Sequence, residues 1–134
     1  MAKKQTYTFA VGKRKTASAR VRLFKGKGEN LVNAIPMEKY FPGPVNKVYW
    51  QRPFVLTETL EKYYVSAKID GSGKDGQLDS LILGIARALS KANPEKFRPA
   101  LKKAGLLKRD SRIRQRRMVG KGGKSRRAKQ SPKR

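Results

Sequence analysis

Residues 77–91, QLDSLILGIARALSK, decide the fold. Apolar residues recur every three or four positions along this stretch, at Leu78, Leu81, Ile82, Ile85, Ala86 and Leu89. This spacing is typical of an amphipathic helix with one broad apolar face. Asp75 is the expected N-cap, and Asn93-Pro94 is expected to close the helix. The stretch therefore predicts a long helix that packs its apolar face against the rest of the core.

Four other segments have the composition and spacing of β-strands. They are rich in β-branched and aromatic residues. The predicted strands are Thr6–Val11, Ala17–Phe24, Glu29–Ala34 and Tyr63–Ile69. Every second residue from Ala17 to Leu23 is alanine, valine or leucine, so these side chains share one face of their strand. Residues 12–15 are expected to interrupt the first strand, and residues 25–28 to form a hairpin turn.

The remaining helices are expected to be short. The predicted ranges are Met37–Phe41, Val45–Gln51 and Pro94–Lys103. Proline limits them, because Pro53 follows the second helix and Pro99 interrupts the third, which Gly105 then stops. An apolar cluster is assigned to the core rather than to a base-stacking surface, because few cations flank it. Its members are Val48, Tyr49, Trp50, Phe54, Val55 and Leu56.

These elements predict an α+β protein with a single small domain. We expect a four-stranded, mainly antiparallel sheet packed by helices over residues 1–106. Residues 107–134 are expected to form a long extended segment, which we name the basic tail. After Leu107 this tail holds 13 Lys or Arg residues and one acid, Asp110. It has too little apolar surface to offset its ordering entropy, so it should stay extended until it meets a polyanion.

The net charge of +25 is concentrated in two parts of the chain. Residues 1–28 contribute +9 and residues 96–134 contribute +16, whereas residues 29–95 are neutral overall. A neutral middle between two basic segments predicts a folded body with surfaces for a polyanion. Nucleic acid is favoured over an anionic membrane, because the basic tail has no apolar face that could insert into lipid.

Composition excludes most enzyme chemistry. The chain has no cysteine and no histidine, which removes disulfides, thiol catalysis and the commonest general base and metal ligand. No cluster of paired carboxylates indicates a catalytic metal site. No run of 18 apolar residues could span a membrane, and the first residues lack the apolar core of a secretory signal. We therefore expect a protein that is not an enzyme and has no cofactor or membrane partner.

Two arginines on the second predicted strand suggest a binding surface. Arg20 and Arg22 alternate with the apolar residues and therefore share the polar face. They could form a solvated sheet face and nothing more. Because the first 28 residues contain no acid, we favour a phosphate-binding patch that joins them to Lys13, Arg14 and Lys15.

Gly71, Gly73 and Gly76 form a G-x-G-x-x-G pattern before the long helix. In a dinucleotide-binding fold, a second parallel strand would follow that helix. Here residues 92–95 mark a helix boundary, and another helix comes next. The pattern is therefore interpreted as a flexible turn. The N-terminus of the helix, together with Lys74, remains a candidate for an RNA phosphate.

The same segment carries the spaced pattern GSGxxGQxxSxxxGxARAL over residues 71–89. It resembles the signature of the family of the ninth protein of the small ribosomal subunit, with Ser72 where that family usually has glycine. GKRKT at residues 12–16, followed by ARV at 19–21, is similar to the start of the family. KAGL at 103–106, RDxR at 109–112, VG at 119–120 and KR at 133–134 are similar to its run into the tail. The resemblance covers nearly the whole chain.

The resemblance implies a structural protein of the cytoplasmic small ribosomal subunit. It implies a body docked on ribosomal RNA in the subunit head, beside neighbouring head proteins. The implied fold is like the second domain of small-subunit protein five, with a left-handed β-α-β crossover. The basic tail would run toward the peptidyl (P) site, where Lys129, Lys133 and Arg134 would contact anticodon stem-loop phosphates of transfer RNA. The expected ribosomal-RNA-binding residues are Lys13, Arg14, Lys15, Arg20, Arg22, Lys74, Arg109, Arg112, Arg114, Arg116, Arg117, Lys121, Lys124, Arg126 and Arg127.

Two other classes share this composition. A histone-like or viral DNA-packaging protein also has a basic tail, but packaging does not need a neutral body that contains aromatic residues. The protein subunit of ribonuclease P is also small and basic, but its Arg-Asn-Arg core motif does not occur in this chain. A preference for duplex DNA would indicate the first class, and cleavage of precursor transfer RNA with an RNA partner would indicate the second.

Overall fold

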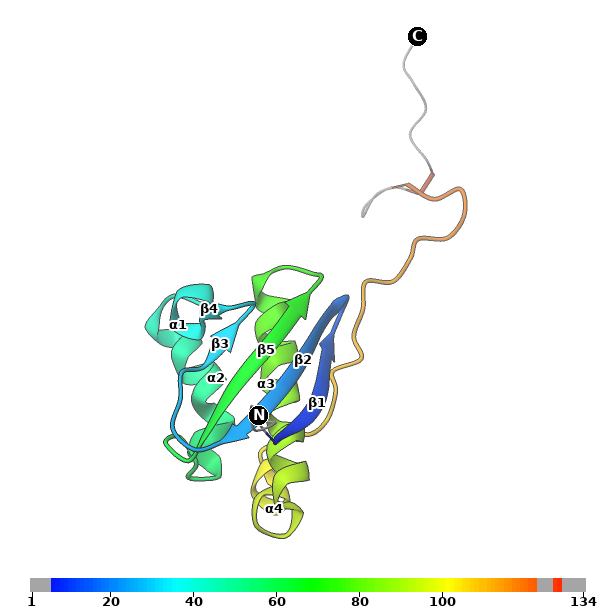
Figure 1. Ribbon diagram of the computed structural model, residues 1–134. Coiled ribbons are helices and arrows are strands. Elements are labelled where there is room, and N and C mark those ends of the chain that lie inside the picture. Colours follow the sequence, from blue (N-terminus) through cyan, green and yellow to red (C-terminus); the bar gives the residue numbers. More distant parts are fainter. Residues whose placement is uncertain (1–5, 123–126, 129–134) are drawn as a thin grey trace.

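A long hairpin forms one side of the sheet (Figure 1). The computed structural model describes residues 6–122 and 127–128. In it, β1 (Tyr7–Arg14) pairs antiparallel with β2 (Ala17–Lys25), and β5 (Tyr63–Asp70) pairs antiparallel with the other edge of β2. The charged residues after Val11 do not interrupt β1, which continues to Arg14 because each of its residues finds a partner on β2.

The sheet has five strands in the order β1-β2-β5-β3-β4 and is mixed, so the prediction of four strands was wrong. The predicted third strand, Glu29–Ala34, is reduced to β3 (Leu31–Val32), and after a break the chain adds an unpredicted strand, β4 (Ile35–Pro36), which pairs with β3. The break falls at Asn33 and Ala34, whose positive φ angles of 51° and 65° turn the chain back.

The loop at residues 25–28 is not a hairpin turn, because β5 lies between β2 and β3. The chain passes from one side of β5 to the other, and β3 pairs parallel with β5. A parallel pair needs a long connection, and helices α1 and α2 supply it.

Four helices accompany the sheet: α1 (Met37–Tyr40), α2 (Pro44–Leu56), α3 (Lys74–Ala92) and α4 (Pro94–Lys103). The predicted bounds of α4 are confirmed, although the helix continues through Pro99. Helix α3 begins earlier than predicted, with Gly73 as its N-cap, so Asp75 lies in its first turn rather than at the cap.

Helix α2 was expected to end before Pro53 but continues to Leu56. Pro53 is buried, and it removes only its own backbone donor from the helix. The helix then ends at Thr57, whose side-chain hydroxyl donates to the Pro53 carbonyl at 2.9 Å.

Helices α2 and α3 lie on one face of the sheet, and no helix in the described part of the chain covers the opposite face (Figure 1). The alternation predicted for β2 is confirmed, because Ala17, Ala19, Val21 and Leu23 are all buried. They pack with the apolar stripe of α3, in which Leu81, Ile85 and Leu89 are fully buried.

Two glycines allow α3 to lie close to β1. A Cβ atom added to Gly12 would lie 2.0 Å from the backbone oxygen of Ser80 and 2.4 Å from the backbone nitrogen of Gly84. Any side chain at position 12 would therefore push α3 away from the sheet.

The apolar cluster assigned to the core is divided between the core and the surface. Trp50 and Phe54 are buried as predicted. The assignment was wrong for the other four members, which are exposed: Val48, Tyr49, Val55 and Leu56. No helix in the described residues is long and apolar enough to cross a membrane.

Candidate nucleic-acid interface

The uncovered face of the sheet, which we name the open face, carries exposed cations. Arg20 and Arg22 on β2 and Lys68 on β5 alternate with buried residues and therefore point away from the helices. In the strand register Arg20 lies directly opposite Lys68. Like charges placed opposite each other destabilise a sheet, so this pairing indicates a surface prepared for an anion. The three cations line a depression of about 590 Å³.

Aromatic rings lie beside these cations, a feature that the sequence analysis did not single out. Tyr7, Phe24 and Tyr64 are neighbours across β1, β2 and β5, with ring centroids 5.6 and 5.1 Å apart. The Arg22 guanidinium lies 5.1 Å from the centre of the Tyr7 ring. Phe9 is opposite Arg22 in the register and is also exposed. Cations interleaved with aromatic rings are typical of surfaces that bind unpaired nucleotides.

The predicted Lys13–Lys15 patch is not a single surface. Lys13 and Lys15 are exposed at the end of β1 and in the turn to β2, where Lys15 has a φ angle of 53°. The Arg14 side chain, by contrast, is only 12% exposed. It alternates to the same side as Gly12, which packs on α3, and so points away from the open face.

Arg14 instead holds the first residues of the basic tail. Its guanidinium lies 2.8 Å from the Asp110 carboxylate and donates to the backbone oxygen of Arg112 at 3.3 Å. Asp79 on α3 lies 3.6 Å from the same guanidinium. Arg112 closes the group, since its side chain donates to both Asp110 oxygens and its backbone N–H donates to one of them. We name Arg14, Asp79, Asp110 and Arg112 the root cluster.

The single acid of the basic tail is therefore its link to the body. Hydrogen bonds from the side chain and then the backbone of Arg112 hold the pKa of Asp110 well below its ordinary value, with a smaller contribution from the charge of Arg14. Arg112 remains 82% exposed, so its remaining donor can still reach a phosphate, whereas Arg14 is enclosed. Arg14, one of the predicted RNA-binding residues, thus connects the tail to the body.

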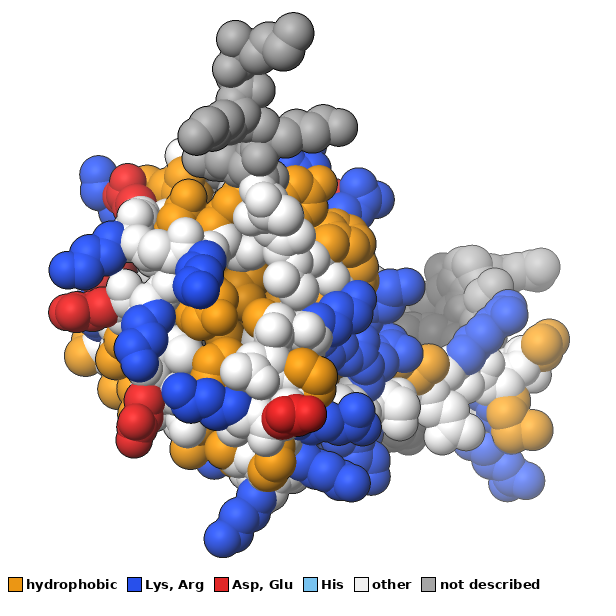
Figure 2. Space-filling model, turned by 60° about the horizontal axis from the view of Figure 1, so that its bottom comes forward, with side chains coloured by type: hydrophobic (Ala, Val, Ile, Leu, Met, Phe, Trp, Pro, Cys, Tyr) orange, Lys and Arg blue, Asp and Glu red, His pale blue; other side chains and the backbone are white. Residues whose placement is uncertain are grey.

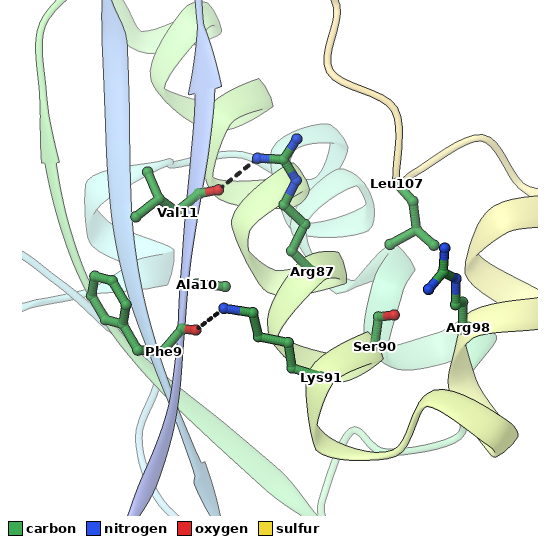
Figure 3. A pocket seen from close by; sticks show the side chains of 8 residues that line it. All are labelled: Phe9, Ala10, Val11, Arg87, Ser90, Lys91, Arg98 and Leu107. Carbon is green, nitrogen blue, oxygen red and sulfur yellow. Dashed lines mark hydrogen bonds between the residues drawn. The ribbon is translucent and has the colours of Figure 1, made fainter.

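A second group of cations lies at the outer edge of β1 (Figure 3). Arg87 and Lys91 reach from α3 and donate to the backbone oxygens of Val11 and Phe9, at 2.9 and 3.0 Å. Together with Arg98 on α4 they line a groove of about 500 Å³. Sequence analysis missed these residues. Their signal is the i, i+4 spacing of Arg87 and Lys91, which places both on one side of α3.

This groove has two roles available to it. The two α3 cations satisfy backbone oxygens that an edge strand would otherwise present to another chain. Both cations keep further donors, and no carboxylate in the described part of the chain forms an ion pair with them or with Arg98. The groove is therefore a second cationic surface suited to phosphate.

The glycine-rich turn before α3 packs on the β1–β2 turn. Gly71 has a φ angle of 85°, and a Cβ atom there would lie 2.3 Å from the backbone oxygen of Thr16. The Gln77 side chain donates to the Gly71 oxygen at 3.0 Å and closes the turn. Lys74 lies with its ammonium 3.3 Å from the centre of the Tyr40 ring, a cation–π contact.

The basic tail leaves the body beside β1 (Figure 1). Figure 2 shows Lys and Arg side chains gathered on the side of the body from which it departs. The described predicted residues of the tail outside the root cluster are exposed: Arg109, Arg114, Arg116, Arg117, Lys121 and Arg127. The other predicted residues of the tail lie outside the described residues: Lys124, Arg126, Lys129, Lys133 and Arg134.

Within residues 6–122 and 127–128, no group of three carboxylates is placed to hold a metal ion. A profile of the family described as Ribosomal protein S9/S16 matches residues 12–134. The chain belongs to this family.

Named members of the family are similar over most of the chain. Small ribosomal subunit protein uS9 of Cutibacterium acnes is 46% identical over 111 residues, which cover 83% of this chain and 64% of that protein. The Amoebophilus asiaticus protein of the same name is 43% identical over 111 residues, covering 83% and 86%. That of Maridesulfovibrio salexigens is 43% identical over 117 residues, covering 87% and 89%.

Family membership makes this chain a structural protein of the small ribosomal subunit and not an enzyme. RNA binding and a place in translation follow from the family. Ribosomal RNA, a folded polyanion, is a partner that the family implies. The resemblance first seen in residues 71–89 is thereby confirmed.

Proposed function

We propose that this protein docks its body, residues 1–106, on ribosomal RNA in the head of the small subunit and directs residues 107–134 toward the P site. The observation that carries this proposal is the open face. Arg20, Arg22 and Lys68 lie there beside exposed aromatic rings, on a face that no helix covers. The cations supply phosphate contacts, and the rings offer stacking surfaces for unpaired bases.

Further ribosomal-RNA contacts come from three other places. Lys13 and Lys15 project at the β1–β2 turn, and the groove formed by Arg87, Lys91 and Arg98 lies along the outer edge of β1. Lys74 can offer its remaining donors beside the N-terminus of α3. The exposed cations of the tail complete the set, with Arg112 contributing the donor that Asp110 leaves free. Arg14 serves this interface indirectly, through the root cluster.

In the P site the basic tail contacts the anticodon stem-loop of transfer RNA through Lys129, Lys133 and Arg134. Arginine offers a planar fork that suits a phosphate group, and lysine offers a point charge. Contacts to phosphate fix position without reading bases. That property suits a site which must hold every transfer RNA in turn.

The experiment for this proposal removes Lys133 and Arg134 and rebuilds small subunits around the shortened protein. We expect normal assembly but dissociation of P-site transfer RNA several-fold faster than from wild-type subunits. A matched control replaces Lys102 and Lys103 on α4 with alanine, which removes the same charge from the body. Equal dissociation rates for the shortened and wild-type proteins would show that these two residues have no role in transfer RNA binding.

A further inference from the structure

Helix α2 carries apolar side chains on two sides. Trp50, Pro53 and Phe54 are buried against the body. On the opposite side Val48 is 68% exposed and Val55 is 54% exposed. The exposed apolar residues follow the i, i+3, i+4 spacing of a second helical face, on which the exposed Arg52 also lies. We name its apolar residues the α2 stripe: Val45, Val48, Tyr49, Val55 and Leu56. A surface helix normally turns polar residues to solvent, so this stripe needs an explanation.

The α2 stripe continues into a depression at the end of the helix. This depression, of about 410 Å³, is lined by Val55 and Leu60 together with Glu58, Glu61 and Lys62. The turn that forms it is held firmly. The backbone N–H of Thr59 donates to the backbone oxygen of Phe54 at 2.9 Å, and the buried hydroxyl oxygens of Thr57 and Thr59 are 2.7 Å apart.

Charge decides what kind of partner fits this surface. The chain has 34 Lys and Arg residues and 9 acids, yet residues 44–62 contain only three cations against two acids. Aliphatic side chains offer no hydrogen bond to phosphate, and Glu58 and Glu61 repel it. RNA is therefore disfavoured here.

We propose that the α2 stripe is the docking face for a neighbouring protein of the small subunit. The partner presents apolar side chains to the stripe, and a Lys or Arg enters the depression between Glu58 and Glu61. Most proteins that bind ribosomal RNA must themselves be basic, which makes a carboxylate-lined depression a suitable receptor. An apolar helical stripe with i, i+3, i+4 anchors is a recurring way to bind a protein partner. The inference rests on membership in the small-subunit family and not on the proposed RNA contacts.

The first test is crosslinking in purified small subunits. One variant carries the photo-crosslinking residue p-benzoylphenylalanine in place of Val48, and a control carries it in place of Arg22 on the open face. We expect position 48 to crosslink to a peptide of another small-subunit protein that contains Lys or Arg beside apolar residues. Position 22 should crosslink to RNA. Crosslinks from position 48 to RNA, to this chain or to a second copy, or no crosslink, would overturn the proposal.

A second test measures the loss of docking. The double variant Val48→Ser, Val55→Ser should lower the occupancy of the crosslinked protein in subunits by about tenfold, as expected when interface anchors are shortened. Occupancy is measured by quantitative mass spectrometry at a limiting concentration of that protein. Glu61→Lys should lower the occupancy of the same protein. Ile35→Ser, at an exposed apolar residue on β4, is the matched control and should change nothing. Unchanged occupancy with the double variant would overturn the proposal. If the RNA-binding proposal failed, position 22 would instead give no crosslink to RNA.

Discussion

The helix-covered face and the open face of the sheet are built from alternate residues of the same strands. On β2, Val21 is fully buried against α3, whereas its neighbours Arg20 and Arg22 are exposed on the other side. The covered face brings backbones close together and excludes water. The open face instead places Arg20 opposite Lys68, at a cost to stability. The difference predicts that stability and RNA binding can be changed separately in this protein, by substitutions one residue apart.

The largest effect on stability should come from Gly12→Ala, which disturbs the packing of the covered face. The added methyl group would meet backbone atoms of Ser80 and Gly84 that cannot move aside without displacing α3. We expect a loss of about 3 kcal/mol in the free energy of unfolding, measured by chemical denaturation, as for an overpacked core. Gly73→Ala is the control, because nothing lies within 4 Å of the added atom. Equal stability of the two variants would mean that β1 and α3 are not closely packed.

Replacing Arg20 and Arg22 with alanine tests the open face. Binding of the protein to small-subunit ribosomal RNA should weaken about tenfold or more, since two charge-assisted contacts are lost. The slope of log affinity against log salt should fall by about 0.7–0.9 for each phosphate contact removed. The free energy of unfolding should stay within about 0.5 kcal/mol of wild type, because both side chains are on the surface.

Lys47→Ala with Arg52→Ala is the matched control for that experiment, since it removes the same charge from α2. We expect its RNA affinity to remain close to that of the wild type. An equal loss of affinity in both variants would indicate that net charge, and not the open face, is responsible for binding.

The smallest effect concerns the root cluster and pH. The pKa of Asp110 is lowered in the folded protein, so its contribution is present above its unfolded value of about 3.9 and is lost only as pH falls through the lower folded value. The amide proton of Arg112, which donates to Asp110, should therefore stay protected from exchange down to about pH 4. Asp110→Ala, which removes the acceptor, should lose that protection at neutral pH, whereas Asp110→Asn keeps an acceptor oxygen and is the control. Normal protection of Arg112 in Asp110→Ala would argue against the root cluster.

Local pattern predicted the central elements of the fold. The 3.6-residue period of α3 and the two-residue period of β2 each concern one element and its burial, and both were read correctly from the sequence. The turn at Asn33 and Ala34 was missed because it depends on pairing with β5, a strand more than 30 residues away. Four residues of the α2 stripe were assigned to the core because hydrophobicity alone does not say which side of a helix is covered: Val48, Tyr49, Val55 and Leu56.

The candidate site shows the same limit. Arg20 and Arg22 were placed correctly by alternation along β2. The same alternation, continued through Gly12, would have turned Arg14 toward α3, but β1 was expected to end too early. Arg87 and Lys91 belong to a helix whose position relative to the edge of β1 is set by tertiary packing. No local pattern in the sequence contains that information.

The root cluster also sets a limit on distance. A fully extended chain advances at most about 3.6 Å per residue, so with Arg112 held at the body, Arg134 can lie no more than about 80 Å from it. Without the cluster, residues 108–112 would lengthen the tether by about 18 Å, because Leu107 is the last residue packed on the core. A shorter tether raises the local concentration of its cations at any target within its range. One aspartate in an otherwise basic segment thus fixes the point from which that segment leaves the body.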